Sequence, residues 1–221
     1  MAILPTLQGP GELRGLSERR LADLAEEIRR TIISTVATTG GHLGSSLGVV
    51  EITLALHRIL ESPRDRIVWD TGHQAYPHKL LTGRYARFGT LRQLGGVGGF
   101  PRRSESDHDV FDGGHAGTGL SIAAGLATAR DVRHGMERIA VVVGDAGKIA
   151  ITSSSHSSAW ISMAWPPPAS GAVQALRTNA SMPGSANTFG NFCSAIRCGL
   201  TRKNQSSSRT ISACDVATRL R

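Results

Sequence analysis

Apolar residues recur every three or four positions through LSERRLADLAEEIRRTIISTVATTGG, near the start of the chain. This spacing predicts an amphipathic helix that buries one face. Ser17 has the side chain of a good N-cap, and the pair Gly40 and Gly41 predicts the end of the helix. The positions expected to face the core are Leu21, Leu24, Ala25, Ile28 and Ile32.

The next apolar segment, LGVVEITLALHRIL, is apolar on nearly all sides, which is typical of a buried helix. Ser62 and Pro63 predict its end, because the residue before a proline disfavours helical angles. Residues 66–70, RIVWD, predict a strand, and the loop TGHQ follows. Strand, loop and helix in this order are typical of an α/β domain whose parallel sheet binds ligands at the carboxyl ends of its strands.

A glycine-rich and charged loop is expected at residues 95–112, where it would cover a site or move. Its acidic stretch SESDHD is expected to be solvated. A helix is predicted from His115 onward, followed by a strand in RIAVVVGD. The residues expected near one face of that helix are Leu120, Ala123, Ala124, Ala127 and Val132.

The pattern changes after Asp145. Residues 146–221 contain 14 serines, a run of three prolines and no glutamate, and no apolar period in them lasts longer than a turn or two. We therefore expect residues 1–145 to form an α/β domain and residues 146–221 to be a largely disordered tail.

The net charge of +8 belongs almost entirely to this tail. Residues 1–145 hold 17 Lys and Arg against 16 Asp and Glu, whereas residues 146–221 hold 8 against 1. A non-catalytic module that binds nucleic acid or an acidic partner through the tail therefore stays open as an alternative function. Because the charges are scattered and the aromatic residues few, nucleic acid is a poor candidate.

The sequence gives no sign of a membrane segment, a secretory signal or a metal-binding cysteine cluster. Apolar runs such as Ile139–Val143 are too short to cross a bilayer, and the N-terminus lacks the charged and apolar regions of a signal peptide. We expect a cytoplasmic protein. Neither a disulfide framework nor a zinc site is predicted by the three cysteines, Cys193, Cys198 and Cys214.

Three histidines stand in glycine-rich turns: His42 in GGHLG, His73 in TGHQA and His115 in GGHAG. Glycine lets the backbone approach a ligand closely, and an imidazole can hydrogen-bond a phosphate or a reacting carbonyl. Each motif alone is more typical of an ordinary turn. Three of them within about 75 residues favour a shared pocket.

Gly144 and Asp145 follow the second predicted strand. A carboxylate at the carboxyl end of a parallel strand can hold Mg²⁺ and, through it, a diphosphate. The alternative is that Asp145 caps a following helix, and the spacing does not decide between the two.

Four stretches of the chain resemble one family. GGHLGSSLGVVEITLALH, DRIVWDTGHQAYPHKLLTGR, LRQLGGVGGFPRRSESDHD and GGHAGTGLSIAAGLATARD are similar to successive parts of the N-terminal domain of 1-deoxy-D-xylulose-5-phosphate synthases. These are thiamine-diphosphate enzymes of the transketolase superfamily. The resemblance covers residues 13–145, and WDTGHQAYPHK together with GGHLG is highly specific for this family.

The resemblance implies a transferase that condenses pyruvate with D-glyceraldehyde 3-phosphate with loss of CO₂, in isoprenoid-precursor and thiamine biosynthesis. It implies a homodimer, the cofactors thiamine diphosphate and Mg²⁺, and a transketolase-like parallel sheet. His42 and His73 resemble the family's histidines near the substrate and the cofactor, and Asp145 resembles its metal-binding aspartate. The other positions that the resemblance places beside the cofactor are Gly114, His115, Ala116, Gly144, Ala146 and Gly147.

The sequence departs from the family's pattern after Asp145. Ala146 stands where the family has the second glycine of a GDG motif, and Gln174 stands where a second Mg²⁺ ligand is expected. The family's later domains, with the glutamate that activates the aminopyrimidine ring, have no counterpart in these 221 residues. We therefore expect a truncated or frameshifted fragment that is inactive by itself.

Overall fold

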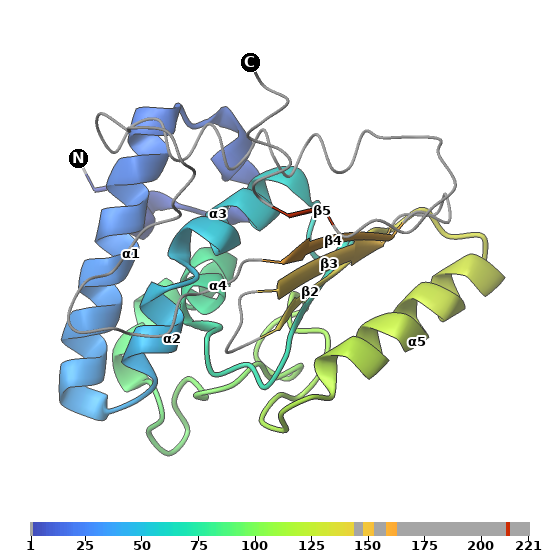
Figure 1. Cartoon of the computed structure of the whole chain (residues 1–221). Coiled ribbons are helices and arrows are strands. Elements are labelled where there is room, and N and C mark those ends of the chain that lie inside the picture. The colour runs from blue at the N-terminus through green and yellow to red at the C-terminus, as the bar shows by residue number, and fades with distance from the viewer. Residues whose placement is uncertain (1, 144–147, 153–157, 163–210, 213–221) are drawn as a thin grey trace.

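The structure is a computed structural model that describes residues 2–143, 148–152, 158–162 and 211–212. A sheet lies between two helical layers, with α1 to α4 on one side and α5 on the other (Figure 1). The helices are α1 (Glu18–Thr39), α2 (Leu43–Leu47), α3 (Val50–Ile59), α4 (Tyr76–Lys79) and α5 (Gly119–Val132), with the 3₁₀ helices η1 (Leu4–Thr6), η2 (Pro10–Gly15) and η4 (Tyr85–Thr90) and the π-type turn η3 (Leu80–Arg84). The strands are β1 (Arg66–Trp69), β2 (Ile139–Val143), β3 (Lys148–Thr152), β4 (Ser158–Ser162) and β5 (Ile211–Ser212).

Helix α1 has the ends and the buried face that its sequence predicts. The Ser17 hydroxyl accepts a hydrogen bond from the backbone N–H of Arg20, and Gly40 ends the helix with a φ of 73°. All five positions predicted to face the core are buried. They pack on α3 and on the segment that contains α4, η3 and η4.

The helix predicted in LGVVEITLALHRIL is α3, and the short helix α2 directly precedes it. Helix α3 is buried on most sides, as its all-round apolar sequence predicts. The short elements α4, η3 and η4 are not predicted by any period. Pro77 stands in the first turn of α4, where proline is accepted, and Gly83, with a φ of 88°, breaks the helical angles within η3.

Helix α5 begins at Gly119, four residues after the predicted start, so His115 lies in the preceding turn. The predicted apolar face is correct for two of its five residues: Ala123 is buried and the half-buried Ala127 packs against the same cluster. It is wrong for Leu120, Ala124 and Val132, which are exposed. Small and apolar residues stand on every side of this helix, so its sequence does not define a single face.

Strands β1 and β2 pair in parallel, with Ile67 opposite Ala140 and Trp69 opposite Val142, as expected for the α/β domain. Alternate residues face opposite layers: Ile67 and Trp69 pack against α3, and Val68 packs against α5. Both faces of this pair are therefore covered.

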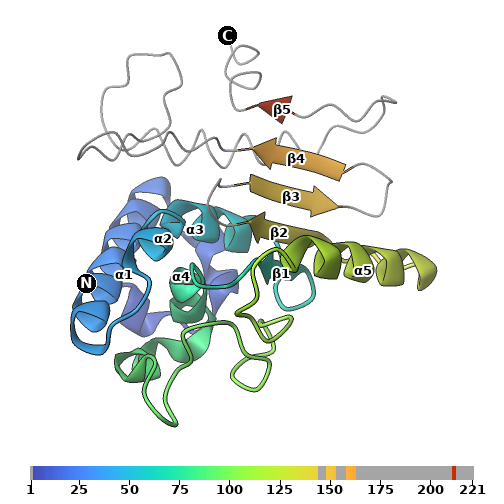
Figure 2. The ribbon, with the colours of Figure 1, turned by 60° about the horizontal axis from the view of Figure 1, so that its bottom comes forward.

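The sheet as a whole is mixed and not wholly parallel. Strand β3 pairs antiparallel with β2 and β4, and β5 pairs in parallel with β4; Figure 2 shows these strands side by side. Strands β3, β4 and β5 fall in the segment for which we expect no such elements. For residues 144–147, 153–157, 163–210 and 213–221, the prediction of disorder lies outside the described residues.

No helix in the described ranges combines the length and the apolar character needed to span a bilayer.

Candidate cofactor site

His42 and His73 meet at the carboxyl end of β1. His42 stands between α1 and α2, and the chain reaches this position through Gly41, which has a φ of 145°. A Cβ atom at Gly41 would lie 2.7 Å from the Tyr76 hydroxyl, so only glycine allows this approach. The Tyr76 hydroxyl also accepts a hydrogen bond from the backbone N–H of His42, at 3.2 Å.

The two imidazole rings are 5.4 Å apart between centroids and meet edge to face at 69°. The Nδ1 atoms of both rings are buried and have no hydrogen-bond partner among the described residues. Burial, then the nearby His73 and then the positive charge of Arg92 lower the pKa of His42 below its ordinary value. His42 is therefore a neutral imidazole at pH 7, with one nitrogen able to donate and one able to accept.

The turn after β1 places His73. Thr71 and Gly72 adopt left-handed angles, with φ values of 60° and 86°, and reverse the chain directly after the strand. The Gln74 side-chain amide donates a hydrogen bond to the Asp70 carbonyl at 3.0 Å. Its Oε1 atom is buried and, like the two histidine Nδ1 atoms, has no partner in the described part of the chain.

The glycine-rich turn before α5 joins the turn after β1, as a shared site requires. The backbone N–H of Gly114 donates to the Thr71 carbonyl at 2.7 Å. The Asp70 carboxylate accepts hydrogen bonds from the backbone N–H groups of Gly119, at 2.9 Å, and Gly117, at 3.3 Å. Asp70 thus caps α5 and ties it to β1, a role that the sequence pattern did not indicate.

The third predicted histidine is not part of the ring pair. His115 and the neighbouring Ala116 are exposed, and within the described residues the His115 ring contacts neither His42 nor His73. The structure therefore brings together two of the three predicted histidines, with the backbone of the third motif beside them.

The predicted metal ligand Asp145 and its neighbours Gly144, Ala146 and Gly147 lie outside the described residues, as does Gln174. Within the described ranges, no group of three His, Cys, Asp or Glu side chains is arranged to hold a metal ion. Strand β2 ends at Val143, and the Asp70 backbone N–H donates to the Val142 carbonyl at 2.8 Å. The ends of β1 and β2 are therefore side by side.

Sequence reasoning missed Arg92, whose positive charge acts on His42. Its backbone has a φ of 61° and its N–H donates to the Val97 carbonyl at 2.7 Å. The signal available was a lone arginine beside two glycines in LRQLGG, which is too common a pattern to single out.

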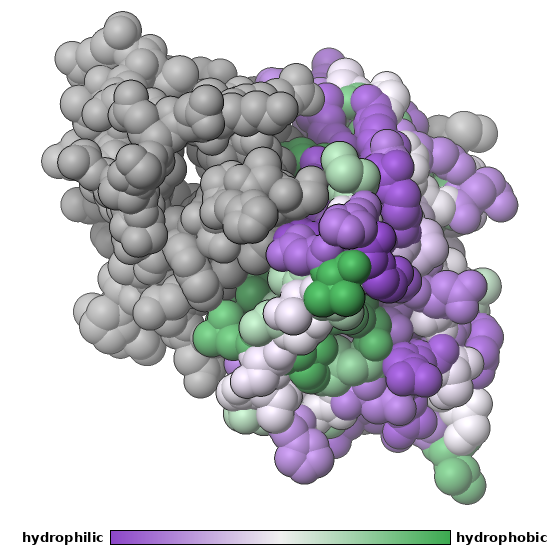
Figure 3. Space-filling model, turned by 90° about the vertical axis from the view of Figure 1, so that its right-hand side faces the viewer, coloured by the Kyte–Doolittle hydropathy of each residue, from purple (hydrophilic) through white to green (hydrophobic). Residues whose placement is uncertain are grey.

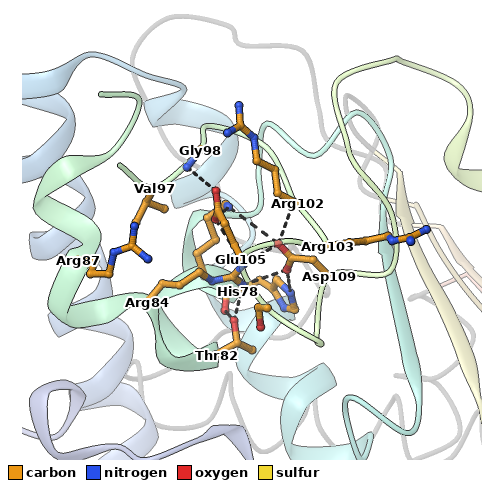
Figure 4. Close-up of polar contacts among 12 residues, drawn as sticks. His78, Thr82, Arg84, Arg87, Val97, Gly98, Arg102, Arg103, Glu105 and Asp109 are labelled. Carbon is orange, nitrogen blue, oxygen red and sulfur yellow. Dashed lines mark hydrogen bonds and ion pairs between the residues drawn. The ribbon is translucent and has the colours of Figure 1, made fainter. Parts of the chain in front are cut away.

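Sequence reasoning also missed a buried ionic network that includes His78, Arg84 and Asp109 (Figure 4). The prediction that SESDHD is a solvated stretch is wrong for Asp109, which is only 4% exposed. Its carboxylate pairs with Arg84 at 2.5 Å and with His78 Nε2 at 3.0 Å. The His57 Nε2 atom lies 2.9 Å from His78 Nδ1, so two histidines and a carboxylate form a continuous chain.

Charge is distributed unevenly along this network. Burial lowers the pKa of His78 to about 4, although hydrogen bonding and attraction to Asp109 oppose the shift. Burial also lowers the pKa of His57 well below its ordinary value. For Asp109, burial raises the pKa, but hydrogen bonds from His78 and Arg84 outweigh it and the net shift is downward. At pH 7 both histidines are neutral, and the ion pair is Asp109 with Arg84.

A family model described as 1-deoxy-D-xylulose-5-phosphate synthase matches residues 4–155. The chain belongs to this family. The match confirms the predicted resemblance and extends it at both ends beyond residues 13–145. Residues 4–12 contribute to the family match in sequence and to the core in structure, where Leu4 is buried.

Curated members of the 1-deoxy-D-xylulose-5-phosphate synthase family are closely similar to this chain. A synthase of Syntrophotalea carbinolica is 60% identical over 145 residues, which are 66% of this chain and 23% of the relative. A second, from Geobacter metallireducens, is 58% identical over 144 residues, which are 65% of this chain and 23% of the relative. A third, from Geobacter sulfurreducens, is 54% identical over 158 residues, or 70% of this chain and 25% of the relative. The chain thus spans about a quarter of the length of the curated relatives it matches.

Proposed function

We propose that this chain carries one part of a thiamine-diphosphate and Mg²⁺ site and serves the condensation of pyruvate with D-glyceraldehyde 3-phosphate. The observation that carries the proposal is the pairing of His42 with His73 at the carboxyl end of β1, beside the turn that contains Gly114. Membership of the synthase family supports the choice of cofactor and substrates.

The residues present fit such a cofactor. Buried polar atoms in folded proteins nearly always have hydrogen-bond partners. Six buried side-chain atoms of the described residues do not have one, and three of the six belong to this site: the Nδ1 atoms of His42 and His73 and the Oε1 atom of Gln74. A ligand that offers both donors and acceptors would satisfy them. When bound, thiamine diphosphate supplies the carbanion chemistry for the decarboxylation and the carbon–carbon bond formation.

The chain's own residues would bind and orient this ligand. His42, kept neutral by burial, can donate or accept a hydrogen bond without introducing a charge. Gly114 leaves open space beside its backbone, because a Cβ atom there would meet nothing within 4 Å. We propose that His115 and Ala116 lie beside the thiamine, as the resemblance implies.

We further propose that Asp145 holds Mg²⁺ and that Gly144, Ala146 and Gly147 approach the diphosphate. This assignment rests on the resemblance and on the side-by-side ends of β1 and β2, where parallel sheets bind ligands. The division into a domain up to residue 145 and a tail from residue 146 stays a prediction. So do the homodimer, the cytoplasmic location and the role in isoprenoid-precursor and thiamine biosynthesis.

Calorimetric titration of the 221-residue chain with thiamine diphosphate and MgCl₂ tests the proposal. We expect saturable binding that His73→Ala weakens at least about tenfold, because a buried nitrogen partner of the ligand is lost. Asp145→Ala should abolish the dependence of binding on Mg²⁺. The control is His134→Asn, at an exposed residue with a φ of 55° that asparagine tolerates.

A folded chain that takes up no thiamine diphosphate at millimolar concentration would overturn the proposal. Salt-sensitive retention on a polyanion column, lost when residues 146–221 are removed, would instead favour the module that binds a partner through a basic tail.

A further inference from the structure

The segment 98–113 forms one wall of the His42 and His73 pair. The Phe100 ring lies 5.7 Å from the His42 ring between centroids. Pro101 packs on Gly72, where an added Cβ atom would lie 2.3 Å from Pro101 Cδ, and its carbonyl accepts a hydrogen bond from the Gly113 N–H at 2.9 Å. The position of this segment therefore sets the shape of the site.

Side-chain contacts must hold this wall, because the segment 98–113 contains no helix or strand. The Asp109 carboxylate accepts a hydrogen bond from the backbone N–H of Arg102 at 2.7 Å, directly after Pro101. The same carboxylate pairs with His78 of α4 and Arg84 of η3 (Figure 4). One buried side chain thus connects the wall to the helical layer.

Glu105 makes a second connection of the same kind. Its carboxylate accepts a hydrogen bond from Lys79 Nζ at 2.6 Å and from the Gly98 backbone N–H at 2.7 Å, two residues before Phe100. The Lys79 side chain is completely buried and the Glu105 side chain is 11% exposed. Both ends of the Phe100 and Pro101 pair are therefore held by carboxylates of the same segment.

In the hydrogen bonds that attach Asp109 to the helical layer, the donor and the acceptor of each bond are fixed. His78 Nε2 must donate a hydrogen bond to the ionised Asp109, so His78 Nδ1 accepts one from His57 Nε2 of α3. A neutral amide in place of Asp109 would remove the closest ion pair of the buried Arg84 guanidinium and leave only its longer contact with Glu105, at 3.7 Å. Losing a buried pair is far more costly than losing an exposed one.

We propose that Asp109 and Glu105 are positioning residues that together latch the segment 98–113 to α4 and η3, so that Phe100 and Pro101 hold the His42 and His73 rings in place. The value of this latch for cofactor binding rests on the proposed function. The latch itself can be measured without any cofactor.

The decisive comparison is Asp109→Asn against Asp107→Asn in the 221-residue chain. Both changes remove one negative charge from the same segment, but Asp107 is exposed and Asp109 is buried. Trypsin cleavage after the exposed Arg102 and Arg103 reports how often the segment opens. We expect about tenfold faster cleavage in Asp109→Asn and a wild-type rate in Asp107→Asn, because cleavage follows the population of the open form.

The ring environment of the site gives a second readout that a general loss of stability would not produce. We expect the titration of His42, followed by NMR, to move toward its ordinary pKa in Asp109→Asn, since Phe100 no longer covers the ring. Far-UV circular dichroism must show that the variant is folded. Wild-type cleavage and an unchanged His42 titration in a folded Asp109→Asn would overturn the latch.

If Asp109→Asn does not fold, Glu105→Gln carries the test, because it weakens the second attachment and leaves Asp109 paired with Arg84 and His78. Faster cleavage in folded Glu105→Gln supports the latch, and a wild-type rate overturns it. A chain that shows the latch but binds no thiamine diphosphate would refute the proposed function and leave the latch standing.

Discussion

At Gly72 the site requires a residue without a side chain. Its φ of 86° belongs to the left-handed region, and the space where a side chain would begin is filled by Pro101. Two requirements, backbone angle and close packing, therefore fall on one residue directly before His73. Gly125 in α5 has neither, because a Cβ atom there would meet nothing within 4 Å.

We predict opposite effects of alanine at these two glycines. Gly72→Ala should lower the free energy of unfolding by about 2–3 kcal/mol, through overlap with Pro101 and a strained backbone. Gly125→Ala should raise it by about 0.5–1 kcal/mol, because alanine restricts the unfolded chain and suits an exposed helix. Urea unfolding of the two variants and the wild type measures both changes. Effects of the same sign would contradict the structure at Gly72.

The elements α3, α4 and η3 meet the segment 98–113 through titratable side chains, and this makes their packing sensitive to acid. The folded pKa of His78 is about 4, against an ordinary value of 6.5. The His57 pKa is shifted in the same direction. Both side chains are fully buried, so protonation would place a positive charge where solvent cannot reach it.

We therefore predict that stability is greatest above pH 6.5 and falls as the pH drops from about 6.5 to about 4. The unfolded chain takes up protons in this range that the folded chain does not, which costs about 1.4 kcal/mol per pH unit for each proton. Urea unfolding at pH 7.5 and pH 5 measures the difference. His57→Gln should flatten the dependence by about one proton, whereas the exposed His134→Asn should not. Equal stability of the wild type at both pH values would show that these histidines are not buried as described.

At the scale of elements, the sequence predicted those helix ends and buried faces that depend on a local pattern of residues. Helix α1 combines a clear period with an N-cap and a glycine stop, and these signals agree. Helix α5 has apolar residues all round, so its exposed face could not be distinguished from its buried one. The buried role of Asp109 depends on Arg84 and His78, 25 and 31 positions away, and no local pattern contains that information.

At the scale of the whole molecule, the two faces of the sheet differ in how much of the chain covers them. The layer of α1 to α4 surrounds a large apolar core, whereas the other face of β1 and β2 is covered by α5 with Val110 and Phe111 of the loop before it. On that side of the molecule, apolar side chains gather at the surface next to polar ones (Figure 3). Val132 is 75% exposed and Met136 is 76% exposed. Apolar groups displayed in this way favour association.

We predict that the chain associates with itself as its concentration rises, and that Val132→Lys reduces this association at least about threefold by replacing an exposed apolar side chain with a charged one. Thr128→Lys is the matched control, because it adds the same charge at an exposed polar position of α5. Sedimentation velocity over a range of concentrations measures the effect. A wild-type chain that stays monomeric throughout would contradict the prediction.

The pairing of His42 with His73 could be anticipated because glycine-flanked histidines and a specific family resemblance pointed to the same residues. The exposed position of His115 could not, since it depends on where α5 begins and on the Asp70 cap. The part of the site assigned to Asp145 stays a prediction.

The parallel pairing of β1 with β2 also bears on how the protein is made. The Asp65 carboxylate binds the guanidinium and backbone N–H of Arg138, which lies 73 positions later in the chain. During synthesis these contacts cannot form until Arg138 has been added. At about 5–20 residues per second, the ribosome needs roughly 4–15 seconds to supply it. During that interval Ile67 and Trp69 have no neighbouring strand, although α3 is already available to cover them. The order in which the chain emerges therefore favours assembly of the helical layer first, with the sheet added to it.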